Sequence, residues 1–211
     1  MTDKVLLKKL REKYGDEEVL VCQTSLTKKI PDRFSPWGKT IYSDFARLGW
    51  FIRRSDAEYN LTFMQLVGYV VVCDADEENF FVSQRISGDE RLKGQYSFFG
   101  GHVSPCDMGP DTVLNAATRE LDEELYGMLL DDELQFMGMV RDNAGPTSEH
   151  LGVVFKAHAM SAQVKETDKL KGIWMSKSEL FSHYNDFEAW GRYIIDYLYE
   201  EMINARKKEE A

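Results

Sequence analysis

The stretch GGHVSPCDMGPDTVLNAATRELDEELYG, residues 100–127, joins a glycine pair to a helix-like segment crowded with carboxylates. On an α-helix, Glu120, Glu123 and Glu124 fall within about 100° of arc. Like charges at this spacing repel one another. A structural helix would interleave lysines, yet the stretch has none, and Arg119 is its only arginine. The segment is therefore either a solvated acidic face or a place that holds a cation, and spacing alone favours neither.

The same segment predicts a helix over residues 111–126 that packs on a sheet. Asp111 favours the helix N-terminus, and Pro110 lies just before it. One face carries Leu114, Leu121 and Leu125, and small residues at 116 and 117 would let the helix approach the sheet closely. Hard divalent cations such as Mg²⁺ prefer oxygen ligands, which the neighbouring carboxylate face supplies.

Apolar runs on both sides of this helix predict a mixed α/β (α+β) fold, a β-sheet sandwiched between helices. Residues 63–73 are the strongest strand, and 79–86 would be its hairpin partner. Further strands are expected at 18–24, 95–103, 134–142, 150–160 and 172–175. Further helices are expected at 4–14, from "SKSEL" (residues 176–180) onward, and at about 186–207. The apolar stripe of the last helix indicates core packing.

The chain divides into an N-terminal extension, residues 1–60, packed on a main domain, residues 61–211. Residues 30–60 read as loop-rich and carry many aromatic side chains. These side chains could cover the core or wall a pocket, and covering the core is the preferred interpretation.

Composition limits the class of partner. The 211 residues have a net charge of −10, which argues against duplex nucleic acid or an anionic membrane as a partner. The longest strongly apolar run, residues 66–73, is too short to span a bilayer. Three widely spaced cysteines form neither a disulfide framework nor a zinc pattern, so we expect a reduced, cytoplasmic setting. The extension or the last helix could build a homodimer contact.

The central stretch resembles the Nudix box, GX5EX7REUXEEXGU, where U is a bulky aliphatic residue. Gly101 matches the first glycine, and residues 119–124, RELDEE, match REUXEE without a gap. Ten positions separate Gly101 from Asp111 where the family has six, Asp111 stands in place of Glu, and Gly127 lies one residue late. The similarity covers about residues 61–200 and resembles the branch called predicted phosphoesterases.

This resemblance implies a Nudix hydrolase domain over residues 61–211. Family members hydrolyse nucleoside diphosphates linked to another moiety, using metal-activated water. The implied metal is Mg²⁺, or Mn²⁺, bound by Glu120, Glu123, Glu124 and the carbonyl of Gly101. Arg119 would orient the carboxylates, and Asp111 would hold Arg119.

The proton acceptor and the phosphate contacts stay open from sequence. Glu120, Glu149 and His150 are candidates for the general base, although a strand-end hydrogen-bonding role is preferred for His150. The small-molecule nucleotide would be bound by residues just before or within the box, namely Arg85, Arg91 and His102. Ordinary surface charge explains the arginines equally well, and loop stabilisation explains His102 equally well. Phe98, Phe99 or Tyr126 could stack on a base.

Two other functions are compatible with the sequence. One is a Nudix-fold nucleotide-binding or sensor module without turnover, although an intact REUXEE argues against it. The other is an isomerase or transferase that acts on a diphosphate, with Cys106 as the catalytic acid, which its place in an irregular loop makes the weakest alternative.

Overall fold

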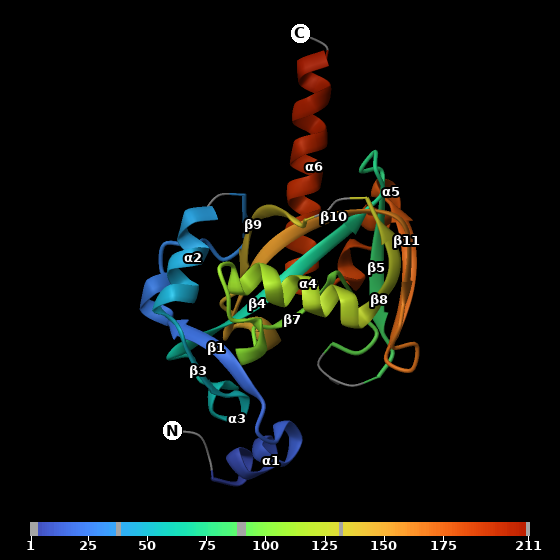
Figure 1. The fold of residues 1–211 in the computed structure, drawn as a ribbon. Coiled ribbons are helices and arrows are strands. Elements are labelled where there is room, and N and C mark those ends of the chain that lie inside the picture. Colours follow the sequence, from blue (N-terminus) through green and yellow to red (C-terminus); the bar gives the residue numbers. More distant parts are fainter. Residues whose placement is uncertain (1–3, 37–38, 88–91, 131–132, 210–211) are drawn as a thin grey trace.

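The computed structural model describes residues 4–36, 39–87, 92–130 and 133–209 (Figure 1). Its helices are α1 (Lys4–Tyr14), α2 (Lys39–Leu48), α3 (Arg54–Ala57), α4 (Thr112–Glu124), α5 (Lys177–Ser182) and α6 (Ala189–Glu209). Its strands are β1 (Glu18–Gln23), β2 (Phe34–Ser35), β3 (Trp50–Arg53), β4 (Phe63–Cys73), β5 (Asn79–Arg85), β6 (Tyr96–Ser97), β7 (Phe99–His102), β8 (Leu125–Leu129), β9 (Gln135–Arg141), β10 (His150–Val164) and β11 (Leu170–Ser176). Short 3-10 turns are η1 (Thr24–Thr27), η2 (Pro105–Asp107), η3 (Gly145–Thr147) and η4 (Tyr184–Asp186).

Strand β4 is the centre of a mixed sheet whose main path runs β11-β5-β4-β10-β9-β2. It pairs in parallel with β10 and antiparallel with β1, β5 and β7. Ten of its eleven residues are buried, because a central strand with both faces covered has no solvent side. The predicted mixed sheet between helices, and the hairpin of β4 with β5, are confirmed.

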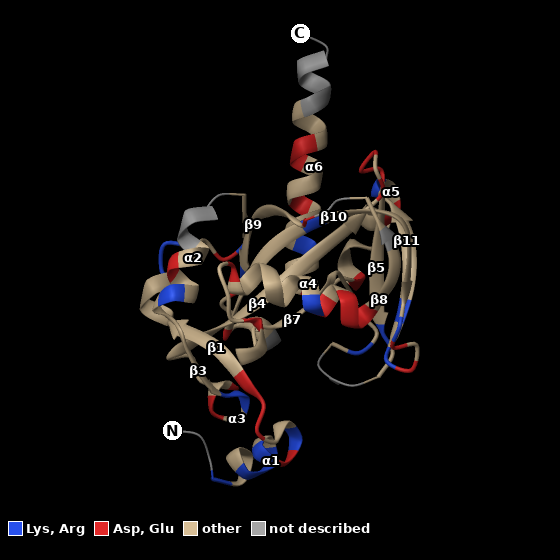
Figure 2. Ribbon diagram, in the orientation of Figure 1, with Lys and Arg blue, Asp and Glu red and all other residues tan. Residues whose placement is uncertain are grey.

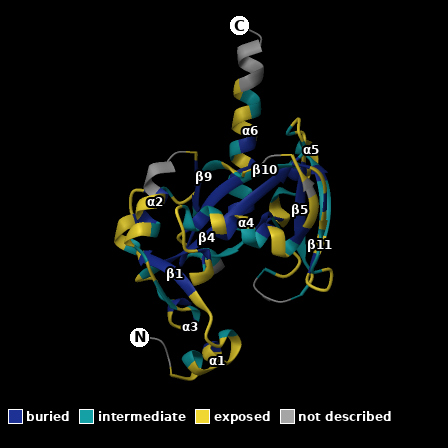
Figure 3. Ribbon diagram, viewed as in Figure 1, coloured by how far each residue is buried: buried dark blue, intermediate teal, exposed yellow. Residues whose placement is uncertain are grey.

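The two faces of β4 belong to different hydrophobic clusters, as the alternation of side chains along a strand requires. Leu66, Val70 and Val72 pack with α4 and α2, whereas the odd-numbered residues from Val67 to Cys73 pack with α6. Helix α4 lies across the front of β4 and β7 in Figure 1, and the far end of α6 projects away from the sheet. Central strands are accordingly the most buried elements in Figure 3.

Close packing of α4 confirms the expected role of its small residues. A side chain at Gly68 on β4 would come within 2.8 Å of the backbone of Ala117, so helix and strand are in direct contact there. Ala116 and Ala117 are fully buried. The apolar stripe of α6 is also core packing, because Trp190, Ile194 and Leu198 are buried against β4.

Residues 30–60 differ from the predicted loop-rich segment, since they contain α2, β3 and α3. Pro36 precedes α2 rather than interrupting it, and the helix is stabilised by tertiary packing. Gly38 lies outside the described residues. Tyr42 stacks on Phe136 at 5.2 Å between ring centroids, and Phe45 is buried beside it. The predicted core-covering role is thus confirmed for these aromatics, while Trp50 is partly exposed and Trp37 lies outside the described residues.

The extension also contributes a strand to the sheet. In β1, Val21 is paired with Gln65 of β4, and β3 forms the edge beyond it. The division at residue 60 stays a prediction. No helix in the described ranges has the length and hydropathy needed to cross a membrane.

Helix α4 ends two residues earlier than predicted. Leu125 has extended backbone angles, and β8 begins there and pairs with the far end of β10. The prediction ran on because Leu125 continues the apolar face of the helix. It is buried in the strand as well, so hydrophobic periodicity could not separate the two conformations.

Candidate metal and substrate site

Helix α4 brings its carboxylates to the edge of β7. Asp111 caps the helix, because its Oδ1 accepts a hydrogen bond from the backbone N–H of Leu114 at 3.2 Å. The Tyr42 hydroxyl donates to Asp111 Oδ2 at 2.7 Å and ties the cap to α2. Figure 2 shows acidic residues gathered at the opposite, C-terminal end of α4, beside a single basic position.

Arg119 is held by Asp107 and not by Asp111, so that expectation was wrong. Its Nε and Nη2 donate to the two oxygens of Asp107 at 2.8 and 2.9 Å, a bidentate pair. Asp111 cannot take this place because its carboxylate is aimed at the first turn of α4. The sequence held a usable signal: Asp107 lies six positions after Gly101, so the extra loop residues follow Asp107 rather than precede it.

From this anchor, Arg119 reaches the carboxylates on its own helix. Its Nη1 donates to Glu120 Oε1 at 2.7 Å and to Glu123 Oε2 at 3.3 Å, and Nη2 donates to the carbonyl of His102 at 3.0 Å. The orienting role expected of Arg119 therefore has a geometric basis. Glu123 is the outermost member, with 59% of its side chain exposed.

Gly101 makes room for Glu120. A side chain at Gly101 would place its first carbon 2.1 Å from the carboxyl carbon of Glu120, so the Glu120 carboxylate would have to move away from β7. Main chain and carboxylate oxygens are thus brought together between β7 and α4, which is the donor set that a hard cation prefers.

Glu124 and Glu120 are energetically expensive to ionise. Burial, together with the charge of Glu120, raises the pKa of Glu124 to about 7, against a hydrogen bond from the Gly100 backbone and the charge of Arg85. Burial also raises the pKa of Glu120, although Arg119 opposes the shift. Arg119 pairs with Glu120 and Glu123, so a further positive charge beside Glu120 and Glu124 would be stabilising.

A cavity of about 350 Å³ lies beside these carboxylates. Of the predicted site residues, it is lined by Arg85, Gly101, His102, Glu120 and Glu124. Glu123 and Arg119 are not in its wall, and Arg91 lies outside the described residues. The volume is in the range of small-molecule sites.

Aromatic residues form the apolar part of the cavity wall. Tyr69, Phe98 and Trp190 line it, whereas Phe99 stacks on Phe81 in the core with ring centroids 5.6 Å apart. Tyr126 is exposed, under the amine of Lys165. Of the three rings predicted to stack on a base, only Phe98 faces the cavity.

A buried carboxylate that the sequence did not single out also faces the cavity. Glu188 Oε1 accepts from the Tyr69 hydroxyl at 2.5 Å, and its two oxygens accept the backbone N–H groups of Trp190 and Gly191. Burial raises the pKa of Glu188. It closes the first turn of α6 and fixes Tyr69 in the wall. A carboxylate just before a helix was the only signal for it.

The predicted proton acceptors are separated by the fold. His150 lines the cavity, but Glu149 points away, where it accepts from Ser148 Oγ at 3.1 Å. His102 is close to His150, with 3.1 Å between their Nε2 atoms. Burial and the charges of Arg54 and His150 hold the pKa of His102 well below its usual value, which favours the neutral imidazole. A contact between His102 and phosphate stays a prediction.

Cys106 does not approach this cavity. Its sulfur is exposed on η2 and lies 3.8 Å from Asp107 Oδ1, outside the set of lining residues. Cys22 and Cys73 are buried in the core. The structure therefore offers no support for a catalytic thiol.

Comparisons with known proteins agree with this geometry. The NUDIX domain family matches residues 64–198. Protein YmaB of Bacillus subtilis (strain 168) is 32% identical over 160 residues, which cover 70% of this chain and 77% of YmaB. The solved structure named "Crystal structure of Tm1382, a putative Nudix hydrolase" superposes with a TM-score of 0.73 at 26% identity, covering 86% of this chain and 98% of that one.

Proposed function

The chain belongs to the Nudix family, and from that premise we propose that it is a divalent-metal-dependent hydrolase of a phosphoanhydride bond in a nucleoside diphosphate derivative. One observation carries the proposal. Glu120 and Glu124, whose ionisation burial opposes, share a small-molecule cavity with Arg85. Carboxylates alone would repel a polyphosphate, so the arrangement calls for a bridging cation.

The donors present fit Mg²⁺ or Mn²⁺. Glu120, Glu123 and Glu124 would hold the ion together with the carbonyl of Gly101, whose missing side chain admits the Glu120 carboxylate. When bound, such an ion supplies Lewis-acid chemistry and lowers the pKa of water.

The protein's own residues would position the reactants. Arg119, fixed by Asp107, holds Glu120 in one orientation. Arg85 offers a guanidinium to a phosphate group, and Phe98 and Trp190 supply an apolar wall for a base or another group. Glu120 and His150 both line the cavity and remain the candidates for proton acceptor, because Glu149 does not.

The proposed class of partner rests on the net charge. A net charge of −10 supports a small nucleotide rather than duplex nucleic acid as the partner. Cytoplasmic location and a homodimer stay predictions.

The test is a hydrolysis screen with Mg²⁺ or Mn²⁺. Candidate substrates are nucleoside triphosphates, nucleotide sugars, dinucleoside polyphosphates and dinucleotide cofactors, with products separated by chromatography. We expect turnover of one class that falls about 10³-fold in Glu124→Gln, the effect of losing several kcal/mol of charge stabilisation. Asp122→Asn is the matched control, because Asp122 is exposed on the same helix and does not line the cavity.

Full activity in Glu124→Gln would contradict the proposed role of α4. Tight binding of a nucleotide without product, in the presence of metal, would favour a sensor module instead.

A further inference from the structure

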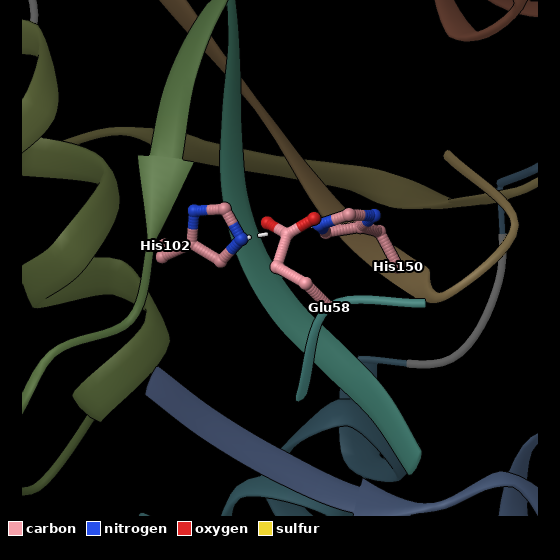
Figure 4. A group of neighbouring side chains, drawn as sticks. All are labelled: Glu58, His102 and His150. Carbon is pink, nitrogen blue, oxygen red and sulfur yellow. Dashed lines mark hydrogen bonds between the residues drawn. The ribbon is translucent and has the colours of Figure 1, made fainter. Parts of the chain in front are cut away.

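Three metal-ligating side chains meet at a second place in the cavity wall. Glu58 follows α3, His102 ends β7, and His150 begins β10. One ligand atom from each lies within 4.8 Å of the others. In Figure 4 the Glu58 carboxylate points between the two imidazoles. None of the three belongs to the carboxylate set of α4.

Sheet register explains why the histidines meet. His150 is the partner of Gln65 on one side of β4, and His102 is the partner of Val67 on the other side. Positions 65 and 67 face the same side of the sheet, so the residues beside them share that face. The pairing of β7 and β10 with β4 therefore places both imidazoles on the same face of the sheet, although 48 residues separate them in the chain.

Glu58 is the residue that requires an explanation. It is 1% exposed, and Arg54 Nε donates to its Oε1 at 3.2 Å. Its other oxygen, Oε2, is buried and has no hydrogen-bond partner in the part of the chain that the structure describes. An unsatisfied buried carboxylate oxygen costs free energy, and a cation would remove that cost.

We propose that Glu58, His102 and His150 bind a transition-metal ion of the zinc class, at a site separate from the Mg²⁺ site expected on α4. Imidazole nitrogen suits Zn²⁺ and other first-row ions, whereas Mg²⁺ takes oxygen ligands. Ligands at roughly 2.0–2.1 Å in a tetrahedron lie roughly 3.3 Å apart. The 3.1 Å between the two Nε2 atoms is close to that spacing.

Three protein ligands leave a coordination position open, as in catalytic rather than closed structural sites. All three line the cavity, and so do two buried polar atoms that find no partner among the residues described, Thr147 Oγ1 and Trp190 Nε1. An oxygen-bearing group of a bound molecule would satisfy the open position and these atoms together. The second metal would thus hold one end of a ligand whose other end lies near α4.

The site also gives the extension a role. Glu58 lies before residues 64–198, the span matched by the family, while both histidines lie within it. A bound ion would therefore connect the extension to the span matched by the family. Binding of this ion does not depend on which substrate the protein hydrolyses.

Co²⁺ binding to the full chain tests the proposal. Protein freed of metal by a chelator is titrated with Co²⁺, whose visible absorption reports nitrogen ligation and geometry, and Zn²⁺ is then added to displace it. We expect one equivalent per chain, with affinity reduced at least about 100-fold in His150→Gln and in Glu58→Gln, since loss of a direct ligand exceeds the effect of losing an outer-shell partner.

Matched variants separate this site from others. His183→Gln, an exposed histidine paired with Asp186, Cys106→Ser and Glu124→Gln should all keep the Co²⁺ spectrum. Circular dichroism and thermal unfolding in chelator establish that Glu58→Gln is folded. If affinity and spectrum are unchanged in both cluster variants, the proposal is overturned and the histidines form only an internal hydrogen bond. Loss of the spectrum in Glu124→Gln alone would likewise overturn it and assign the ion to α4.

Discussion

Glu120 and Glu124 of α4 line the same cavity as the cluster of Glu58, His102 and His150, but the two sites are built in different ways. Glu120, Glu123 and Glu124 lie within two turns of one helix, so local helical geometry brings them together. The cluster takes one residue from each of three segments and exists only when β4 is correctly paired on both sides. The arrangement of the α4 carboxylates depends only on the helix, whereas the arrangement of the cluster depends on the pairing of the sheet.

The two places also deal with charge differently. On α4, burial and neighbouring carboxylates raise the pKa values of Glu120 and Glu124, so their ionisation is unfavourable. In the cluster a single carboxylate is buried with one oxygen unsatisfied. A hard cation suits the former and a nitrogen-binding cation the latter, so metal specificity is the property that separates them.

The largest expected effect comes from removing the anchor of the α4 site. Asp107→Ala should lower the free energy of unfolding by about 3 kcal/mol, because it leaves the half-buried Arg119 without its bidentate partner. Chemical denaturation measures this change. If the loss is under about 0.5 kcal/mol, the level of an ordinary surface substitution, Asp107 does not organise the α4 site.

An effect of similar size should appear in the pH dependence of stability. The pKa of Glu124 is about 7 in the folded chain and near its ordinary value when unfolded, so the folded state binds more protons between these values. Stability is therefore lost as pH rises from about 4.5 to 7. In the presence of chelator, Glu124→Gln should gain about 3 kcal/mol of stability relative to wild type across this window.

Adding Mg²⁺ should abolish that difference, because the ion stabilises the charged form of Glu124. Zn²⁺ at one equivalent should not, if it occupies the cluster. Denaturation curves for both proteins at pH 5 and pH 8 measure the effect. If wild type and Glu124→Gln show the same pH dependence in chelator, ionisation of Glu124 does not destabilise the fold.

The smallest effect is expected at the other end of α4. Asp111→Ala removes the helix cap and the hydrogen bond from Tyr42, which should cost about 1 kcal/mol and leave hydrolysis within about twofold of wild type. Thermal unfolding and steady-state rates measure this. A loss of activity as large as that expected for Glu124→Gln would contradict a role for Asp111 that is confined to capping the helix.

Much of the architecture was readable in advance because its causes are local. Apolar runs identified β4, β5, β9 and β10, and helical spacing identified α4 with its carboxylate face. Helix α2 was missed because its stability comes from Tyr42 and Phe45 packing against distant residues, and such contacts leave no local pattern.

Sequence by itself determined which residues α4 presents on one side, since a helix imposes its own periodicity on any chain that forms it. The spacing from Gly101 favoured Asp107, but the tertiary structure decided that Asp107 rather than Asp111 holds Arg119, because it fixes where each carboxylate points. It also decided that Glu58 meets two histidines. Strand pairing brings together residues far apart in the chain, and spacing along the sequence carries no record of that register.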